Sequence, residues 1–461
     1  MILGAIVVTI RISNKNKVTM NYKSYMLHNY KTLPQIENLS AELIEAIDVV
    51  GSVLPFKTNN YVIENLINWN NVPNDPIFVL TFPQKGMLRL NHYQRMKETL
   101  ESGASKSEIK IVADEIRLEL NPHPAGQLDH NVPIVDGEKV FGIQHKYRET
   151  VLFFPGQGQT CHAYCTFCFR WPQFVGMDEL KFASKQTEGL IKYISDHPEV
   201  TDVLFTGGDP LIMKTKILEA YIRPLLESNL EHLKNIRIGT KALAYWPYRF
   251  LTDDDAEDIL SLFKDVKKAG KHLAFMAHFN HPVELEPAVV KEAIEKVLCA
   301  GALIRTQSPV MKNINDSPGV WADMLKKQVE LGCIPYYMFI ARNTGADHYF
   351  SLPLYNVWQI FREAYQSVSG ICRTVRGPSM SCLPGKLQII GVNEIKGEKV
   401  FTLRFIQGRE PDWVAKSFFA KFDENAIWYT DLKPAFGEES FFFQEELDKI
   451  LKPGEIEIDY K

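Results

Sequence analysis

Three cysteines stand close together in the segment CHAYCTFC, at Cys161, Cys165 and Cys168, with the spacing C-x3-C-x2-C. Thiolates that share one loop can surround a single metal centre, and soft sulfur ligands suit iron–sulfur clusters and zinc. A four-iron cluster on three cysteines leaves one iron open to a small ligand, whereas structural zinc normally closes with a fourth protein ligand. His162 is too near Cys161 in the chain for easy joint chelation. The spacing therefore favours an iron–sulfur cluster, with zinc binding and unrelated buried thiols as the alternatives.

The other cysteines and the composition argue against a disulfide-bonded protein and against a protein that binds nucleic acid or membranes. Cys299, Cys333, Cys372 and Cys382 are scattered, and the total of seven is odd, so no disulfide framework is expected. We interpret these four as buried small hydrophobic residues in a reducing compartment, with no zinc site among them. A hydrophobic content of 45%, a charged content of 23% and a net charge of -4 indicate a globular protein with no pull toward nucleic acid or membranes. A small molecule is therefore the expected partner.

Short apolar runs alternate with amphipathic helical stretches from Thr150 onward, and these elements must position the cysteine loop. Six β–α alternations predict an α/β fold, a parallel sheet with outer helices that forms a partial (β/α)6 TIM-like barrel. Ligands in such folds lie at the carboxyl ends of the strands, and the cysteine loop follows the first of them. The predicted strands are 151–154, 201–206, 235–240, 272–277, 302–307 and 334–340, and predicted helices include 184–196, 254–269, 287–299 and 319–331.

The chain divides into three predicted domains. Residues 1–125 predict a mainly helical N-terminal domain, and residues 126–370 hold the predicted barrel. Residues 371–461 predict a small C-terminal α+β extension. Within it, the apolar runs 387–392 and 399–406 predict antiparallel strands around the turn-prone IKGEK.

The first ten residues, MILGAIVVTI, are apolar, but they lack the basic start and cleavage site of a signal peptide. They are also too short to span a bilayer. They predict either an edge strand or a segment ahead of a true start at Met20. Because no other stretch approaches a transmembrane length, a cytoplasmic location is expected.

A second motif, TGGDP (206–210), ends the second predicted strand. Glycines let the backbone approach a ligand closely, although GGDP alone is more often a simple tight turn. Together with the cysteine loop after the first strand, the motif resembles the radical SAM superfamily, where SAM is S-adenosylmethionine. The resemblance implies that the three loop cysteines hold a [4Fe–4S] cluster whose open iron is chelated by SAM. It also implies that Gly207, Gly208 and Asp209 contact the amino group of SAM and that Arg170 binds its carboxylate.

Further segments resemble the lysine 2,3-aminomutase family of radical SAM enzymes, from near residue 60 to near residue 395. The resemblance implies pyridoxal 5′-phosphate (PLP) as another cofactor, held through a Schiff base to Lys386. Gln307 matches a family residue near the PLP phosphate. His278 and His281 are candidates for polar contacts near the cofactor, with structural roles as the alternative. The matching segments are HKYRETVLFF (145–154), IRIGTKA (236–242), HFNHP (278–282), TQS (306–308), PYY (335–337) and PGK (384–386).

The resemblance also implies the reaction, a 1,2-amino shift in a free amino acid. One electron cleaves SAM to methionine and a 5′-deoxyadenosyl radical. The substrate amine displaces Lys386 from PLP as an imine, the radical removes a hydrogen from the β-carbon, and nitrogen migrates through an azacyclopropylcarbinyl radical. The protein would be an isomerase that needs an electron donor such as flavodoxin or ferredoxin. Because family members self-associate, a homo-oligomer is expected.

The sequence departs from the family at two contacts to the PLP phosphate. The family's two arginines ahead of the first strand align with Lys146 and Thr150. Lys146 keeps the positive charge and Thr150 loses it, and Arg148 is a candidate substitute at a neighbouring position. Arg373 and Arg376 are further candidates for binding the phosphate or the substrate α-carboxylate, with structural roles as the alternative.

Substrate specificity is predicted to differ as well. Lysine-specific members hold the distant ammonium with two carboxylates, at positions that align with Arg342 and Ser379. An arginine repels an ammonium but can form paired hydrogen bonds with a carboxylate. An acidic amino acid such as glutamate is therefore the expected substrate. Lysine stays an alternative if Arg342 points elsewhere or if Asp347 supplies the carboxylate.

Two other classes of protein remain open from the sequence. One is a radical SAM enzyme of another reaction class with a repurposed or lost PLP site, which the changed phosphate contacts and the unmatched tail favour. The other is a non-enzymatic zinc or scaffold protein.

Overall fold

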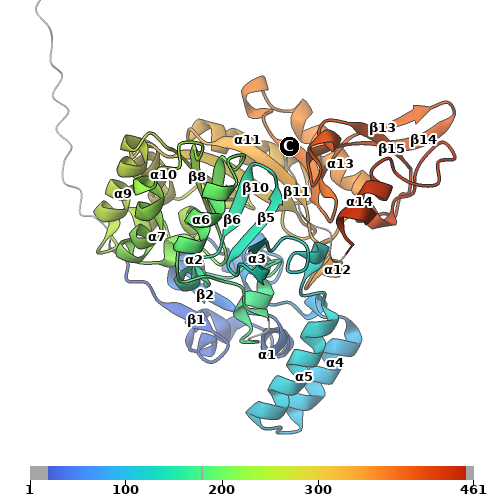
Figure 1. Cartoon of the computed structure of the whole chain (residues 1–461). Coiled ribbons are helices and arrows are strands. Elements are labelled where there is room, and N and C mark those ends of the chain that lie inside the picture. The colour runs from blue at the N-terminus through green and yellow to red at the C-terminus, as the bar shows by residue number, and fades with distance from the viewer. Residues whose placement is uncertain (1–18, 136, 178–179, 453–461) are drawn as a thin grey trace, which may run out of the picture.

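The computed structural model describes residues 19–135, 137–177 and 180–452 of the chain. They form a mixed α/β architecture with one large sheet flanked by helices, and the helical N-terminal part lies at the bottom of Figure 1. The edge strand predicted as one alternative for residues 1–10 falls outside the described residues. None of the helices within the described ranges is long and apolar enough to cross a membrane.

Six neighbouring strands of the large sheet run parallel, as the alternating pattern predicts. Each coincides closely with one of the predicted apolar runs, because a strand covered by helices needs apolar side chains along its length. They are β6 (Thr150–Phe153), β7 (Asp202–Phe205), β8 (Asn235–Thr240), β9 (His272–His278), β10 (Leu303–Val310) and β11 (Ile334–Ile340).

Amphipathic helices connect these strands and turn their apolar sides to the sheet. In the helix at 256–268, Ile259, Leu262, Phe263 and Val266 are buried at the spacing of one helix face. The four predicted helices are confirmed as α6, α9, α10 and α11. The connecting helices are α6 (Glu188–Asp196), α7 (Thr215–Glu227), α8 (Ala242–Tyr245), α9 (Ala256–Lys268), α10 (Ala288–Cys299), α11 (Pro318–Glu330), α12 (Asp347–Phe350) and α13 (Leu354–Gln366).

The sheet continues beyond the parallel strands on both sides. β5 (Ile143–Tyr147) pairs antiparallel with β6, and β12 (Arg376–Ser381) pairs parallel with β11. The predicted C-terminal hairpin is confirmed as β13 (Gly385–Ile395) and β14 (Glu398–Gly408), and β15 (Ser417–Lys421) follows it. All eleven strands form one hydrogen-bonded sheet, which therefore crosses the predicted domain boundary after residue 370.

The sheet curls strongly, since strands far apart in its order touch each other. β5 and β12 stand seven places apart in the strand order, which would separate them by over about 30 Å in a flat sheet. Lys146 on β5 nevertheless donates through Nζ to the carbonyl of Cys382, the residue after β12. Arg409, after β14, donates through Nη2 to Asn131 Oδ1 at 2.6 Å, ahead of β5. Side chains from distant strands therefore meet.

Helices dominate the N-terminal part of the described chain. The elements are α1 (Ala41–Val53), α2 (Asn60–Asn65), α3 (Pro76–Thr81), α4 (Leu90–Glu101) and α5 (Lys106–Glu119), with the antiparallel pair β1 (Ser24–Met26) and β2 (Lys57–Asn59). Ser40 Oγ caps α1 by accepting from the Leu43 N–H, and a Ser105–Glu108 capping box begins α5. α4 and α5 form a hairpin that projects from the body in Figure 1. Further short elements are β3 (Ile134–Val135), β4 (Glu138–Lys139) and α14 (Gln444–Ile450).

Candidate active site

The cysteine loop leaves the carboxyl end of β6 and is held by the N-terminal part of the chain. Lys57 on β2 donates through Nζ to the Cys161 carbonyl at 2.7 Å, and its own carbonyl accepts from the Tyr164 N–H at 2.8 Å. The Thr166 N–H donates to the carbonyl of Leu80 on α3 at 2.9 Å. The conformation of the loop therefore depends on the N-terminal helices as well as on the sheet.

The three thiols lie within electrostatic range of one another. Burial raises the pKa of Cys161 well above its ordinary value, and Asp209 adds to the increase. Burial also raises the pKa of Cys168, to about 12, and the pKa of Cys165, against the opposing influence of Lys241. A bound metal centre would deprotonate these groups, because the thiolate is the ligand form.

The three thiols offer the donor set of an iron–sulfur cluster. Within the described residues, no group of three or more His, Cys, Asp or Glu side chains is gathered tightly enough to hold one metal ion. A four-iron cluster needs no such tight group, since each thiolate binds a different iron. Three soft sulfurs on one loop therefore suit the cluster.

The glycine turn of TGGDP packs directly against the start of the cysteine loop. A Cβ on Gly208 would lie 2.3 Å from the Thr160 carbonyl oxygen, so a larger residue would displace the backbone. The Asp209 N–H donates to that same oxygen at 2.7 Å. The Asp209 carboxylate, 2% exposed, accepts from Thr240 Oγ1 and from the Lys241 N–H, each at 2.8 Å. Asp209 thus ties the ends of β7 and β8 to the loop with a carboxylate that protein donors already satisfy.

Two arginines meet at the ring of Phe169, next to Cys168. The guanidinium carbon of Arg170 lies 5.0 Å from the centre of this ring, and that of Arg342 lies 4.4 Å from it. Burial lowers the pKa of Arg170 to about 9, and Arg342 contributes to the decrease. Neither arginine forms an ion pair with any residue that the structure describes. Two cations on one aromatic ring without a carboxylate favour an anionic ligand.

Lys386, the second residue of β13, presents its amine to aromatic rings. Nζ lies 4.2 Å from the centre of the Tyr337 ring and 5.6 Å from that of Tyr147, and it donates to Gln407 Oε1 at 3.0 Å. Burial lowers the pKa of Lys386 well below the ordinary lysine value. A neutral amine in such surroundings is the reactive form of a lysine that binds a carbonyl compound. Nearby cations lower the pKa further; they are Arg376, Arg237, Lys146 and Arg342.

The cations around Lys386 form a site with too little negative charge. Among the described side chains, Arg237 is the one member of the group that pairs with a carboxylate, Asp202, at 3.3 Å. The buried Nε of Arg376 has no hydrogen-bond partner. Lys146 donates to a backbone carbonyl and gains no opposite charge from it. Two arginines beside a lysine amine of lowered pKa fit a phosphorylated aldehyde, which is the chemistry of PLP.

Strand register sets a row of side chains next to this amine. Across β9 to β12, His278 lies opposite Gln307, Gln307 opposite Tyr337, and Tyr337 opposite Arg376. Gln307 Nε2 donates to His278 Nε2 at 2.6 Å. Burial lowers the pKa of His278 to about 3, with a further decrease from Lys241, so the ring stays neutral and can accept. Gln307 thereby neighbours the ring that Lys386 contacts.

Comparison with known proteins gives the site its context. A protein of Aquifex aeolicus, provisionally named an L-lysine 2,3-aminomutase, is 32% identical over 396 residues, covering 86% of this chain and 92% of its own length. The chain belongs to the lysine 2,3-aminomutase family. The L-lysine 2,3-aminomutases of Bacillus subtilis and Clostridium subterminale are 28% and 27% identical, over 59% and 55% of this chain and 60% and 58% of their own. No family profile matches.

Among solved structures, a radical SAM methyltransferase from Sphaerobacter thermophilus aligns with 64% of this chain and 94% of its own. The identity is 12% and the TM-score 0.37, a likeness too low to bear on fold or function.

Membership in the lysine 2,3-aminomutase family confirms the predicted resemblance. The protein is therefore a radical SAM enzyme and an isomerase, with a small-molecule substrate and a need for a reductant. Membership also supports the expected cofactors, a [4Fe–4S] cluster, SAM and PLP. The residues that hold each cofactor, and the substrate, are proposals.

Two of the arginines considered for anion binding in this family member make local contacts. Arg148 occupies the turn between β5 and β6, where its exposed side chain pairs with Glu149 at 3.5 Å. Arg373 donates through Nε to the Val368 carbonyl at 3.0 Å, ahead of β12. Arg376, three residues further along, is the arginine that faces Lys386.

Ser379 and His281 make local contacts. Ser379 is fully buried and donates through Oγ to the Met338 carbonyl at 3.4 Å, which ties β12 to β11. His281 Nδ1 accepts from the Val283 N–H at 3.4 Å, within its own turn. The contact of His281 fits the structural role that was the alternative to a contact with the cofactor.

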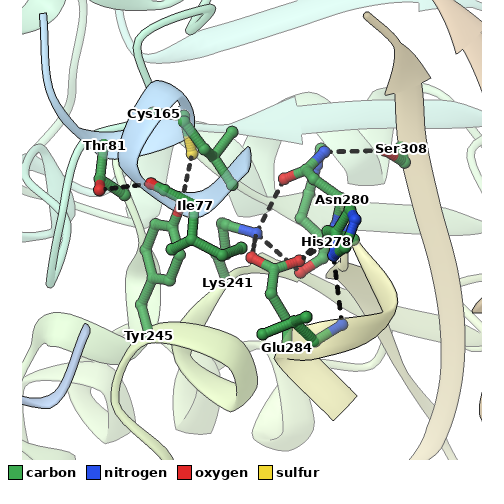
Figure 2. Close-up of polar contacts among 12 residues, drawn as sticks. Ile77, Thr81, Cys165, Lys241, Tyr245, His278, Asn280, Glu284 and Ser308 are labelled. Carbon is green, nitrogen blue, oxygen red and sulfur yellow. Dashed lines mark hydrogen bonds and ion pairs between the residues drawn. The ribbon is translucent and has the colours of Figure 1, made fainter. Parts of the chain in front are cut away.

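Sequence reasoning did not single out a buried charged network beside the cysteine loop (Figure 2). Lys241 Nζ donates to Glu284 Oε1 at 2.5 Å and to Asn280 Oδ1 at 2.8 Å. The ammonium also lies 4.3 Å from the centre of the Tyr245 ring, whose hydroxyl lies 3.5 Å from Cys165 Sγ. A lysine directly after a strand end is a usable signal, whereas Glu284 follows no strand and gives none. The network contacts the loop through Tyr245 and Cys165.

Replacing Glu284 by alanine should cost about 3 to 5 kcal/mol of the free energy of unfolding, because it leaves Lys241 buried without its carboxylate. Glu284 is fully buried, and Oε2 also accepts from the N–H groups of Asn280 and His281. Urea denaturation of the metal-free protein measures the loss. The matched control is Glu286→Ala, which breaks an exposed ion pair with Lys327 and should cost less than about 1 kcal/mol. Equal losses in the two variants would contradict the role of the network.

Proposed function

We propose that this family member is a radical SAM, PLP-dependent aminomutase that moves the α-amino group of a free amino acid to the β-carbon. The observation that supports it most is Lys386, whose amine rests on the Tyr337 ring among cations. We also propose that β6 to β11 and their helices form a partial (β/α)6 barrel around that amine. The contact of Lys146 with the Cys382 carbonyl supports this curvature.

The cysteine loop would hold the [4Fe–4S] cluster and leave one iron for SAM. With SAM bound, this group supplies a 5′-deoxyadenosyl radical that removes hydrogen from a substrate carbon. The backbone of Gly207 and Gly208 would face the amino end of SAM, because these residues pack against the loop without side chains. Asp209 would position that backbone through its bonds to the loop and to β8. Arg170, whose guanidinium lies near the Phe169 ring, would pair with the carboxylate of SAM.

Lys386 would hold PLP through its amine nitrogen. The depressed pKa leaves a larger share of this amine unprotonated than in an ordinary lysine, and the unprotonated amine is the form that attacks an aldehyde. The rings of Tyr337 and Tyr147 limit the access of water to it. Gln307 and Lys146 would contact the cofactor from β10 and β5. When bound, PLP supplies a π-system that accepts the unpaired electron while nitrogen migrates.

An acidic amino acid such as glutamate is the proposed substrate, and Arg342 is the proposed specificity residue. Arg342 follows β11 and rests on Phe169, with no carboxylate paired to it among the described residues. Asp347, the alternative partner for a substrate ammonium, accepts from the N–H of its neighbour His348 at 2.7 Å. A free guanidinium attracts a side-chain carboxylate and repels a lysine ammonium.

In an anaerobic assay with SAM, PLP and reductant, glutamate should give a β-amino acid product and lysine should not. Arg342→Ala should lower kcat/KM for the acidic substrate by roughly a hundredfold, because a desolvated charge pair is lost. Arg362→Ala is the matched control, since this guanidinium lies on the outer helix α13, 5.9 Å from the centre of the Trp358 ring. Formation of β-lysine by the unaltered enzyme would overturn the proposed substrate while keeping the proposed reaction.

Thr150, where the family has a cation, favours one alternative, a radical SAM enzyme of another reaction class. That alternative predicts deoxyadenosine without any rearranged amino acid in the same assay.

A further inference from the structure

The PLP phosphate needs cations, and the chain lacks one where the family has an arginine, at Thr150. The structure brings another arginine to this position from a different strand. Arg237, on β8, donates through Nη2 to Thr150 Oγ1 at 3.1 Å. Asp202 holds the same guanidinium at 3.3 Å through its Oδ1. Arg237 on β8 thus places a positive charge next to Thr150, the position on β6 where the family's arginine is missing.

Arg376 supplies a second cation on the same side of Lys386. Its guanidinium carbon lies 4.2 Å and 4.6 Å from the ring centres of Tyr336 and Tyr337. Tyr337 is also the ring on which the Lys386 amine rests, at 4.2 Å. The Nε of Arg376 is buried and has no hydrogen-bond partner, and no ion pair within the described ranges includes this residue. A buried donor with no acceptor is costly unless a ligand provides one.

We propose that Arg376 and Arg237 form the phosphate-binding site for PLP in this chain, in place of the cation that is missing at Thr150. The proposal rests on the proposed function, because it needs PLP on Lys386. A phosphate dianion accepts paired hydrogen bonds from a planar guanidinium, and Arg376 lies over two rings with its buried Nε unpaired. Asp202 offsets part of the charge of Arg237, so Arg376 carries the larger share.

The test compares two aldehydes that differ by the phosphate alone, PLP and pyridoxal. Each is titrated onto the full-length protein without cofactor, and the visible absorbance of lysine-bound aldehyde reports binding. Arg376→Ala should weaken PLP binding by at least about tenfold, since a hydrogen bond to a charged group is lost. Pyridoxal has no phosphate, so its affinity should change between the variant and the unaltered protein only as far as the reactivity of the Lys386 amine changes. The ratio of the two affinities therefore cancels any effect of Arg376 on the amine itself.

Further variants make the result specific. Arg237→Ala should shift the ratio in the same direction by less, and Arg376→Lys should recover part of the preference for PLP. Arg373→Ala is the matched control, because this arginine bonds to the Val368 carbonyl and should leave the ratio unchanged. Arg376→Gln keeps a polar side chain without the charge and tests the charge if Arg376→Ala does not fold.

An unchanged ratio in Arg376→Ala or Arg376→Gln would overturn the phosphate site and leave the proposed function standing. A loss of substrate affinity with unchanged PLP binding would overturn it too, since Arg376 would then bind the substrate carboxylate. If the unaltered protein binds neither aldehyde through Lys386, the proposed function itself fails.

Discussion

Replacing Lys386 by alanine should abolish the visible absorbance of bound PLP and lower aminomutase activity by at least about a thousandfold, the order expected when a covalent group is removed. The reason is that the Lys386 amine, near the rings of Tyr337 and Tyr147, is the proposed partner of the aldehyde. Absorbance titration with PLP and single-turnover product analysis measure the two effects. Deoxyadenosine formation from SAM should persist, because the cysteine loop is untouched.

The matched control is Lys399→Ala on the same hairpin, where Nζ lies 3.6 Å from the centre of the Phe422 ring. It should bind PLP as the unaltered protein does. Retained absorbance in Lys386→Ala would assign PLP to another lysine and contradict the proposed role.

The pH dependence of PLP capture follows from the same surroundings. Burial and the cations depress the pKa of Lys386, so its amine remains neutral well below the usual lysine pKa of about 10.4. Capture should therefore persist below the usual lysine pKa and fall as the pH drops through the lowered pKa. Removing Arg376 should shift this fall to higher pH, because one repelling charge is gone.

Replacing Cys165 by alanine should remove nearly all bound iron and acid-labile sulfide from protein reconstituted without oxygen. A cluster on this loop has three thiolates, and two sulfurs cannot hold four irons in place. SAM cleavage to deoxyadenosine should fall to background, and product formation should fall with it. Iron and sulfide analysis and the absorbance of the cluster measure the loss.

The control is Cys299→Ala at the end of α10, which should keep its iron. The Cys299 thiol is exposed, so the expectation that all four scattered cysteines are buried is wrong for this one. Zinc in place of iron in the unaltered protein, or full iron in Cys165→Ala, would contradict the cluster assignment.

Local pattern in the sequence determined the helices and strands of this protein. The six apolar runs became β6 to β11, and the C-terminal runs became β13 and β14, because the alternation of buried and exposed side chains is a property of a short segment. The cysteine spacing and the TGGDP turn were readable for the same reason, since their chemistry lies within one loop. The cysteine loop, the TGGDP turn and the further matching segments together predicted the family.

The three-dimensional fold alone decided which charged residues meet. Arg373 and Arg376 look equivalent in the sequence, yet one bonds to the Val368 carbonyl and the other faces Lys386. Arg148 turns toward Glu149, while Arg237 enters from β8.

The physical reason is the curl of the sheet. It places Lys146 against the carbonyl of Cys382 although many strands separate them, and no local pattern encodes such a contact. Register and side-chain direction depend on packing over the whole molecule, so the anion site around Lys386 emerges only when all its strands are in place.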